Sequence, residues 1–131
     1  MRHHAEARGL ALTLDSAGTG GWHAGEAPDP RSIQTCRKYG VDIADQRARQ
    51  IVAEDFRRFD LILALDGANL MQLQHMVPPD LEDKIRLFGD YAGIGGVADP
   101  YYGDLDGFEE CWTEIDRAAI AFLDALQSGQ V

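Results

Sequence analysis

The sequence lacks the marks of several common classes of protein. It has only two cysteines, Cys36 and Cys111, too few for a disulfide framework and without the spacing of metal ligands. We therefore expect reduced thiols, no bound metal and a cytoplasmic location. No apolar run is long enough to span a membrane, and residues 1–8 do not resemble a signal peptide. Neither a GxGxxG sequence nor a Walker-type loop is present, so we expect no cofactor.

Basic residues are also scarce. The chain has 22 acidic residues against 12 Lys and Arg, which gives a formal net charge of −10. Such a surface repels nucleic acid and anionic membranes, because phosphate contacts need clustered basic side chains. We expect neither as a partner. An anionic substrate would require a local positive feature to overcome this field, and the sequence shows none.

What is present is a globular composition. At 131 residues and 45% hydrophobic residues, the chain suits one domain over residues 1–131. Apolar patterning and turn residues predict a helix ending at Gly9, a strand over 10–16, a loop over 17–30, helices over 30–40 and 53–58, a strand over 60–65, a helix over 68–76, a strand over 85–88 and a long final helix. Strands that alternate with helices predict a three-layer α/β fold with a parallel sheet.

The final helix has the clearest pattern in the sequence. One apolar stripe runs along it, formed by Phe108, Cys111, Trp112, Ile115, Ala119, Phe122, Leu123 and Leu126. In the earlier helix over 30–40, Cys36 shares a face with Ile33, which predicts a thiol packed in the core. Both cysteines are therefore expected to have structural roles.

The loop Asp99-Pro100-Tyr101-Tyr102-Gly103 is the first candidate for chemistry. A carboxylate beside two aromatic rings could act as a general acid in a cleft that binds an aryl group. By themselves, the same residues are more typical of a turn that begins with Asp-Pro and carries surface tyrosines. A glycine-rich segment around Trp22 could stack on a ring, or it could be an ordinary turn.

A nucleophile to accompany this acid is missing. Phosphate-ester chemistry by cysteine needs Cys and Arg separated by five residues in a tight loop whose amides bind the anion. Cys36 fails, because Asp42 occupies the position of the arginine. Cys111 and Arg117 have the right spacing, but the segment has no glycine, carries two acidic residues and lies within the predicted helix. We therefore reject the match.

Seven segments, in this order, resemble the low-molecular-weight protein-tyrosine phosphatases. They are Asp15-Ser16-Ala17-Gly18-Thr19, Trp22-His23-Ala24-Gly25, Pro28-Asp29-Pro30-Arg31, Arg47-Ala48-Arg49-Gln50, Glu54-Asp55-Phe56-Arg57-Arg58-Phe59-Asp60, Leu65-Asp66-Gly67-Ala68-Asn69 and Asp99-Pro100-Tyr101-Tyr102-Gly103. The resemblance covers nearly the whole chain. It implies a flavodoxin-like, four-stranded parallel sheet and hydrolysis of phosphotyrosine proteins or small aryl phosphates through a phosphocysteine, without metal.

The resemblance also implies a role for each matching residue. Asp99 matches the general acid; Tyr101, Tyr102, Trp22 and His23 match the walls of the substrate cleft; Ser16 and Asp66 match supports of the phosphate loop. Gln46 stands where many members carry a histidine, so this supporting network departs from the family pattern.

The largest departure is at the start of the sequence. The family opens with an apolar strand and a Cys-x5-Arg-Ser loop, whereas this chain begins within the helix that follows them. We expect a start codon placed too late or a shortened polypeptide, with poor stability and no phosphatase activity in this form. Two alternatives remain: a non-catalytic binding or regulatory module, and the related arsenate reductase branch, which should carry additional redox cysteines.

Overall fold

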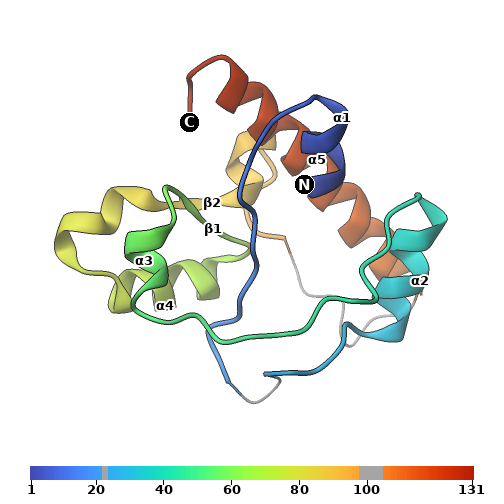
Figure 1. The fold of residues 1–131 in the computed structure, drawn as a ribbon, viewed down its shortest axis with the longest axis horizontal. Helices are drawn as coiled ribbons and strands as arrows, with labels where there is room; N and C mark the ends of the chain where they lie inside the picture. Colours follow the sequence, from blue (N-terminus) through green and yellow to red (C-terminus); the bar gives the residue numbers. More distant parts are fainter. Residues whose placement is uncertain (22–23, 98–104) are drawn as a thin grey trace.

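The first helix ends where the sequence predicts. The computed structural model describes residues 1–21, 24–97 and 105–131 (Figure 1). Helix α1 (Arg2–Ala7) is followed by Gly9, whose φ of +68° lies in the left-handed region that favours glycine. The helix packs its one buried residue, Ala5, into the core.

Helix α2 (Pro30–Lys38) has both of the predicted end signals. The side chain of Asp29 accepts a hydrogen bond from the backbone N–H of Arg31 at 2.8 Å, and proline occupies the first turn. After the helix, Gly40 adopts a φ of +80°. The helix predicted over 30–40 is therefore confirmed.

Two short parallel strands form the sheet of the described residues. Strand β1 (Ile62–Ala64) pairs with β2 (Ile85–Leu87), and helix α4 (Gly67–Met76) joins them with the 3-10 helix η1 (Pro79–Lys84). The parallel register pairs Ile62 with Ile85, Leu63 with Arg86 and Ala64 with Leu87. These elements confirm the strand–helix–strand order expected from the sequence.

Three short helical elements complete the middle of the chain. Helix α3 (Asp55–Arg58) confirms the short helix predicted in this region, whereas η1 and η2 (Phe88–Ala92) were not predicted. Lys84 caps the C-terminal end of α3: its Nζ donates to the carbonyl oxygens of Phe56 and Phe59 at 3.0 and 3.1 Å. A cation at this end also complements the helix dipole.

The sheet separates two hydrophobic clusters, which gives the predicted three layers (Figure 1). On one face, side chains of α1, η2 and the long helix α5 (Leu105–Gln127) pack against Leu61 and Leu63. On the other face, α3 and α4 supply Phe56 and Leu73 to the second cluster. Alternate residues of β1 thus point into opposite clusters, as expected for a strand between two layers of helices.

Helix α5 confirms the apolar stripe. Its buried residues are Phe108, Ala118, Ala119, Phe122 and Leu123. The half-buried residues of the stripe are Cys111, Trp112, Ile115 and Leu126. The ring of Tyr91, from η2, meets Phe122 edge to face at 5.0 Å between ring centroids. Among the helices of the described residues, none is long and apolar enough to cross a bilayer.

The strand predicted over residues 10–16 is wrong. This segment carries the expected alternation of leucines, and Leu10 and Leu14 pack against the hydrophobic cluster formed by α1, η2 and α5. Its backbone, however, forms no ladder with any described residue. Its backbone is held near its ends instead: Leu10 N–H donates to Ala5 O, and Arg2 Nη2 donates to Leu14 O. Alternating side chains create a strand only where a neighbouring strand pairs with its backbone.

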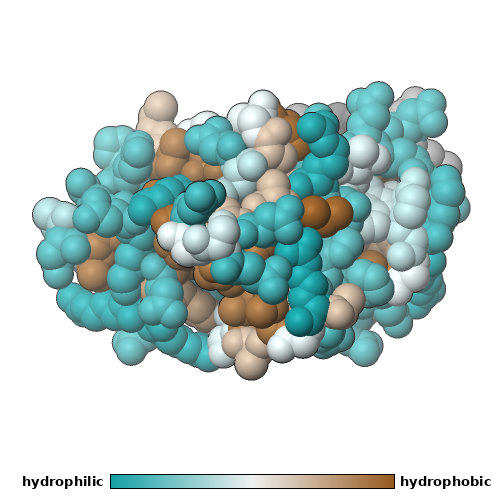
Figure 2. Space-filling model, turned by 90° about the horizontal axis from the view of Figure 1, so that it is seen from above, coloured by the Kyte–Doolittle hydropathy of each residue, from teal (hydrophilic) through white to brown (hydrophobic). Residues whose placement is uncertain are grey.

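The absence of that pairing leaves apolar surface exposed. The run over 60–65 reads as a strand buried on both faces, yet Leu65 is 43% exposed and Leu12, on the unpaired segment, is 36% exposed. Figure 2 shows hydrophobic atoms at the surface in the middle of one face, surrounded by hydrophilic ones. The apolar run over 60–65 is therefore less completely buried than its sequence predicts.

Candidate functional site

Most of the predicted site residues lie outside the part of the chain that the structure describes. These are Asp99, Trp22, His23, Tyr101 and Tyr102, whose roles remain predictions. Ser16 and Asp66 are described, and so are the segments on either side of the two loops that carry the others. The geometry of the site is therefore built from these supporting segments.

Asp66 follows β1 and begins helix α4. Its Oδ1 accepts a hydrogen bond from the backbone N–H of Asn69 at 2.7 Å, the usual geometry of an N-cap. The carboxylate is half-buried at the carboxyl end of the parallel strand. In open α/β sheets this end is where ligands bind, so its position agrees with a site residue.

The segment that leads to Asp99 lies against the same strand end. Val97 is buried, and its N–H donates to the carbonyl oxygen of Leu65 at 2.6 Å. A Cβ on Gly96 would stand 3.4 Å from the Cα of Asp66. Asp66 and the residues entering the Asp99 loop are thus brought together, although they are 30 positions apart in the sequence.

A close backbone crossing turns the chain back toward this point. A Cβ built on Gly89 would lie 1.8 Å from the carbonyl oxygen of Gly95, which excludes any side chain there. The N–H of Ile94 donates to Gly89 O at 2.9 Å, and Gly93 between them has a φ of +68°. Glycine is therefore required at this crossing by contact as well as by conformation.

A second supporting segment, residues 48–51, holds both ends of the loop that contains Trp22 and His23. At the near end, Gly18 and Gln50 form a parallel bridge, with hydrogen bonds of 2.8 Å from Gly18 N to Arg49 O and from Ile51 N to Gly18 O. At the far end, Gly25 N donates to Ala48 O and Ala48 N donates to Glu26 O, at 2.6 and 2.8 Å. Sequence reasoning missed this anchor, although Arg47-Ala48-Arg49-Gln50 is one of the segments carrying the resemblance.

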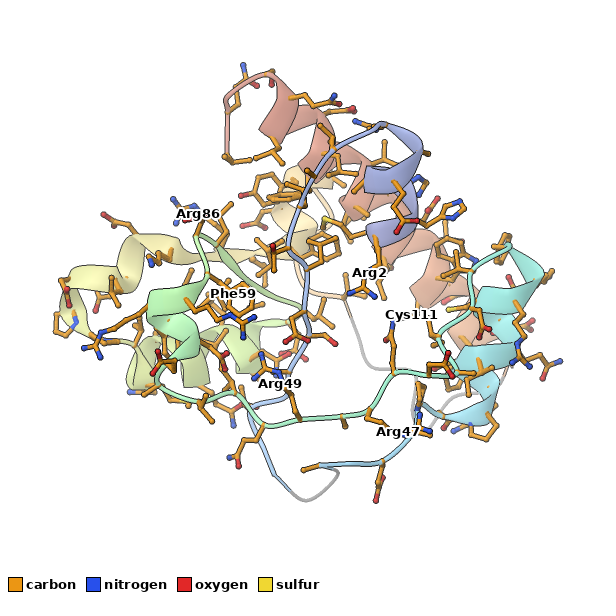
Figure 3. The ribbon with its side chains drawn as sticks, viewed as in Figure 1. Arg2, Arg47, Arg49, Phe59, Arg86 and Cys111 are labelled. Carbon is orange, nitrogen blue, oxygen red and sulfur yellow. The ribbon has the colours of Figure 1, made fainter. Side chains whose placement is uncertain are left out.

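Arg49 fixes the segment just before Ser16. Its guanidinium lies 3.1 Å from one carboxylate oxygen of Asp15, and Ser16 N donates to the other at 2.8 Å. The same guanidinium makes a bidentate pair with buried Asp55, at 2.9 and 3.1 Å. Figure 3 shows Arg49 and Arg2 reaching the central segment from opposite sides. Ser16 itself is exposed.

The Arg49 pair shifts the ionisation of its partner. Hydrogen bonds from Arg49 are the main reason why the pKa of Asp55 lies below its usual value, with further help from the N–H of Val52. The same hydrogen bonds raise the pKa of Arg49. Both groups remain charged at neutral pH, so the link between the two segments persists there.

Helices α2 and α5 are linked next to the residues that follow the Asp99 loop. Glu109, near the start of α5, accepts hydrogen bonds from Lys38 Nζ at 2.7 Å and from the hydroxyl of Tyr39 at 2.5 Å. The Tyr39 ring meets Trp112 edge to face, and Arg31 lies 4.5 Å from the centroid of the Phe108 ring. The hydrogen bonds lower the pKa of Glu109, with that from Lys38 first, which keeps it ionised.

Neither thiol is placed as a nucleophile. Cys36 is half-buried, so the prediction of a thiol packed in the core is only partly met, and this burial raises its pKa. Cys111 lies within the unbroken helix α5, six residues before exposed Arg117. Six residues turn a helix by about 600°, which places the two side chains on different sides, and the helical amides are not free to bind an anion.

No cluster of metal ligands occurs within the described ranges, where no group of three or more His, Cys, Asp and Glu side chains could hold an ion. Within the same ranges, the acidic and basic side chains instead pair across segments, as at Arg49 and Glu109.

Comparisons with known proteins decide the family. The family described as low molecular weight phosphotyrosine protein phosphatase matches residues 1–131. The chain belongs to this family. A low molecular weight phosphotyrosine protein phosphatase from Schizosaccharomyces pombe is 38% identical, covering 96% of this chain and 84% of that protein. A low molecular weight protein-tyrosine-phosphatase from Streptomyces coelicolor is 41% identical, covering 97% and 82%.

The fold agrees with this family. A crystal structure of a low molecular weight phosphotyrosine phosphatase from Vibrio cholerae superposes with a TM-score of 0.92 at 27% identity, over 99% of this chain and 86% of that one. The expected flavodoxin-like α/β class is therefore confirmed. The chain is a domain of the low-molecular-weight protein-tyrosine phosphatase type, and the family resemblance drawn from seven short segments was right.

Proposed function

We propose that residues 1–131 supply the general acid and the walls of the aryl-binding cleft of a phosphotyrosine phosphatase site. In this proposal Asp99 protonates the leaving phenolate, and Tyr101, Tyr102, Trp22 and His23 border the ring of a phosphotyrosine protein or a small aryl phosphate. Membership of the family supports the reaction class. The adjacency of Asp66 and the chain entering the Asp99 loop supports the place of the acid.

We also propose that this polypeptide alone does not hydrolyse phosphotyrosine. The observation that carries this proposal is the position of the two cysteines: Cys36 has no arginine six residues later, and Cys111 lies inside α5. Without a thiolate no phosphoenzyme forms, and without a loop of free amides and an arginine the charge of the transition state is unsupported. Ser16 and Asp66 are then supports for a phosphate loop that this sequence does not contain.

The reaction class can be tested by adding the missing parts. The chain is expressed behind an apolar strand followed by a Cys-x5-Arg-Ser loop, and turnover of an aryl phosphate is measured at steady state. We expect activity to appear, and Asp99→Asn to lower kcat by about 10²–10⁴-fold, the usual contribution of a general acid.

Asp104→Asn is the matched control, because it removes an acidic group of the same sequence region that has no catalytic role in the proposal. We expect it to leave kcat within about twofold, well below the general-acid effect. Activity that is insensitive to Asp99→Asn would refute the role of Asp99. Extended chains that fold but show no activity would refute the reaction class.

A binding role gives a different outcome. Titration of the 131-residue chain with phosphotyrosine would show saturable binding without turnover if the chain were a non-catalytic module. We expect no binding, because the loop that would hold the phosphate is absent and the net charge of −10 opposes an anion. A cytoplasmic location remains a prediction, consistent with two cysteines that form no disulfide.

A further inference from the structure

We draw no further inference here: the strongest candidate, the outer edge of β1 with half-buried Leu10 and Leu14 near it, is an apolar edge without a ladder partner among the described residues, and nothing in the structure shows what covers it.

Discussion

At the scale of single residues, the Arg49–Asp55 pair is an ion pair whose carboxylate is buried. Both oxygens of Asp55 accept from one guanidinium, as those of Asp29 do from Arg31, but Asp29 is only half-buried. Removing one partner of such a pair leaves the other buried without its hydrogen bonds, which lowers the stability of the fold. Arg49 also binds Asp15, whose carboxylate accepts from the N–H of Ser16. The predicted site residue Ser16 is thus connected through Asp15 and Arg49 to the start of α3.

Asp55→Asn should lower the free energy of unfolding by about 2 kcal/mol, because it removes a charge-assisted bidentate contact while retaining the volume of the side chain. Asp15→Asn is the matched control: Asp15 contacts the same guanidinium but its side chain is 46% exposed, so we expect a loss under about 1 kcal/mol. Urea unfolding at neutral pH measures both. A loss for Asp15→Asn as large as that for Asp55→Asn would contradict this ranking.

The same pair makes a prediction about pH. Because hydrogen bonds from Arg49 hold the pKa of Asp55 below its unfolded value, this contribution to stability is fully present above the unfolded pKa and is lost as the pH falls through the folded pKa. Between about pH 5 and pH 2 the wild-type chain should lose more stability than Asp55→Asn. Urea midpoints at several acidic pH values test this. Parallel plots of midpoint against pH for the two proteins would show that Asp55 contributes nothing to the pH dependence of stability.

At the scale of elements, the start of α2 depends on one side chain. Asp29→Ala removes the acceptor for Arg31 N–H and should cost about 1 kcal/mol, the usual effect of losing an N-cap. Glu6→Ala on the exposed face of α1 is the control, with an expected change within about 0.5 kcal/mol. Thermal unfolding followed by circular dichroism distinguishes them, and an unchanged Tm for Asp29→Ala would refute the role of the cap.

Substitutions at Gly89 and Gly93 distinguish the cost of a steric contact from the cost of an unfavourable backbone conformation. Gly89→Ala should destabilise the chain by more than about 3 kcal/mol or prevent folding, since a methyl group would meet a backbone oxygen that cannot move freely. Gly93→Ala, in the same turn, meets no atom within 4 Å and should cost only the strain of positive φ, about 1–2 kcal/mol. Comparable unfolding curves for the two variants would mean that the crossing is not a tight contact.

At the scale of the whole molecule, local patterns predicted the elements well where local forces decide them. The caps of α2 and the stripe of α5 could be predicted because capping and burial depend on residues close in sequence. The strand predicted over residues 10–16 was wrong, because a strand also needs a neighbour that pairs with its backbone, and local patterning does not show whether one is present. For the site, the two candidate loops were predicted from their residues and remain predictions. The contacts of the flanking segments with Leu65, Asp66 and residues 48–51 could not be predicted, because they join segments distant in the sequence.

The incomplete sheet predicts low overall stability. Leu12 and Leu65 are 36% and 43% exposed, and β1 has a single ladder partner among the described residues. We expect a free energy of unfolding below about 5 kcal/mol, the lower end of the range for typical domains. Urea unfolding of the wild-type chain followed by tryptophan fluorescence and circular dichroism measures it. A value near about 10 kcal/mol would show that the sheet is complete in a way that the described residues do not reveal.

We propose that the 131 residues contain the general acid of a phosphatase site but not its nucleophile. The most direct measurement is the turnover of p-nitrophenyl phosphate by the purified 131-residue chain, with its intact mass confirmed. We expect no phenolate release above that of buffer, either from this chain or from Asp99→Asn. Release by the wild-type chain that Asp99→Asn abolishes would contradict the claim.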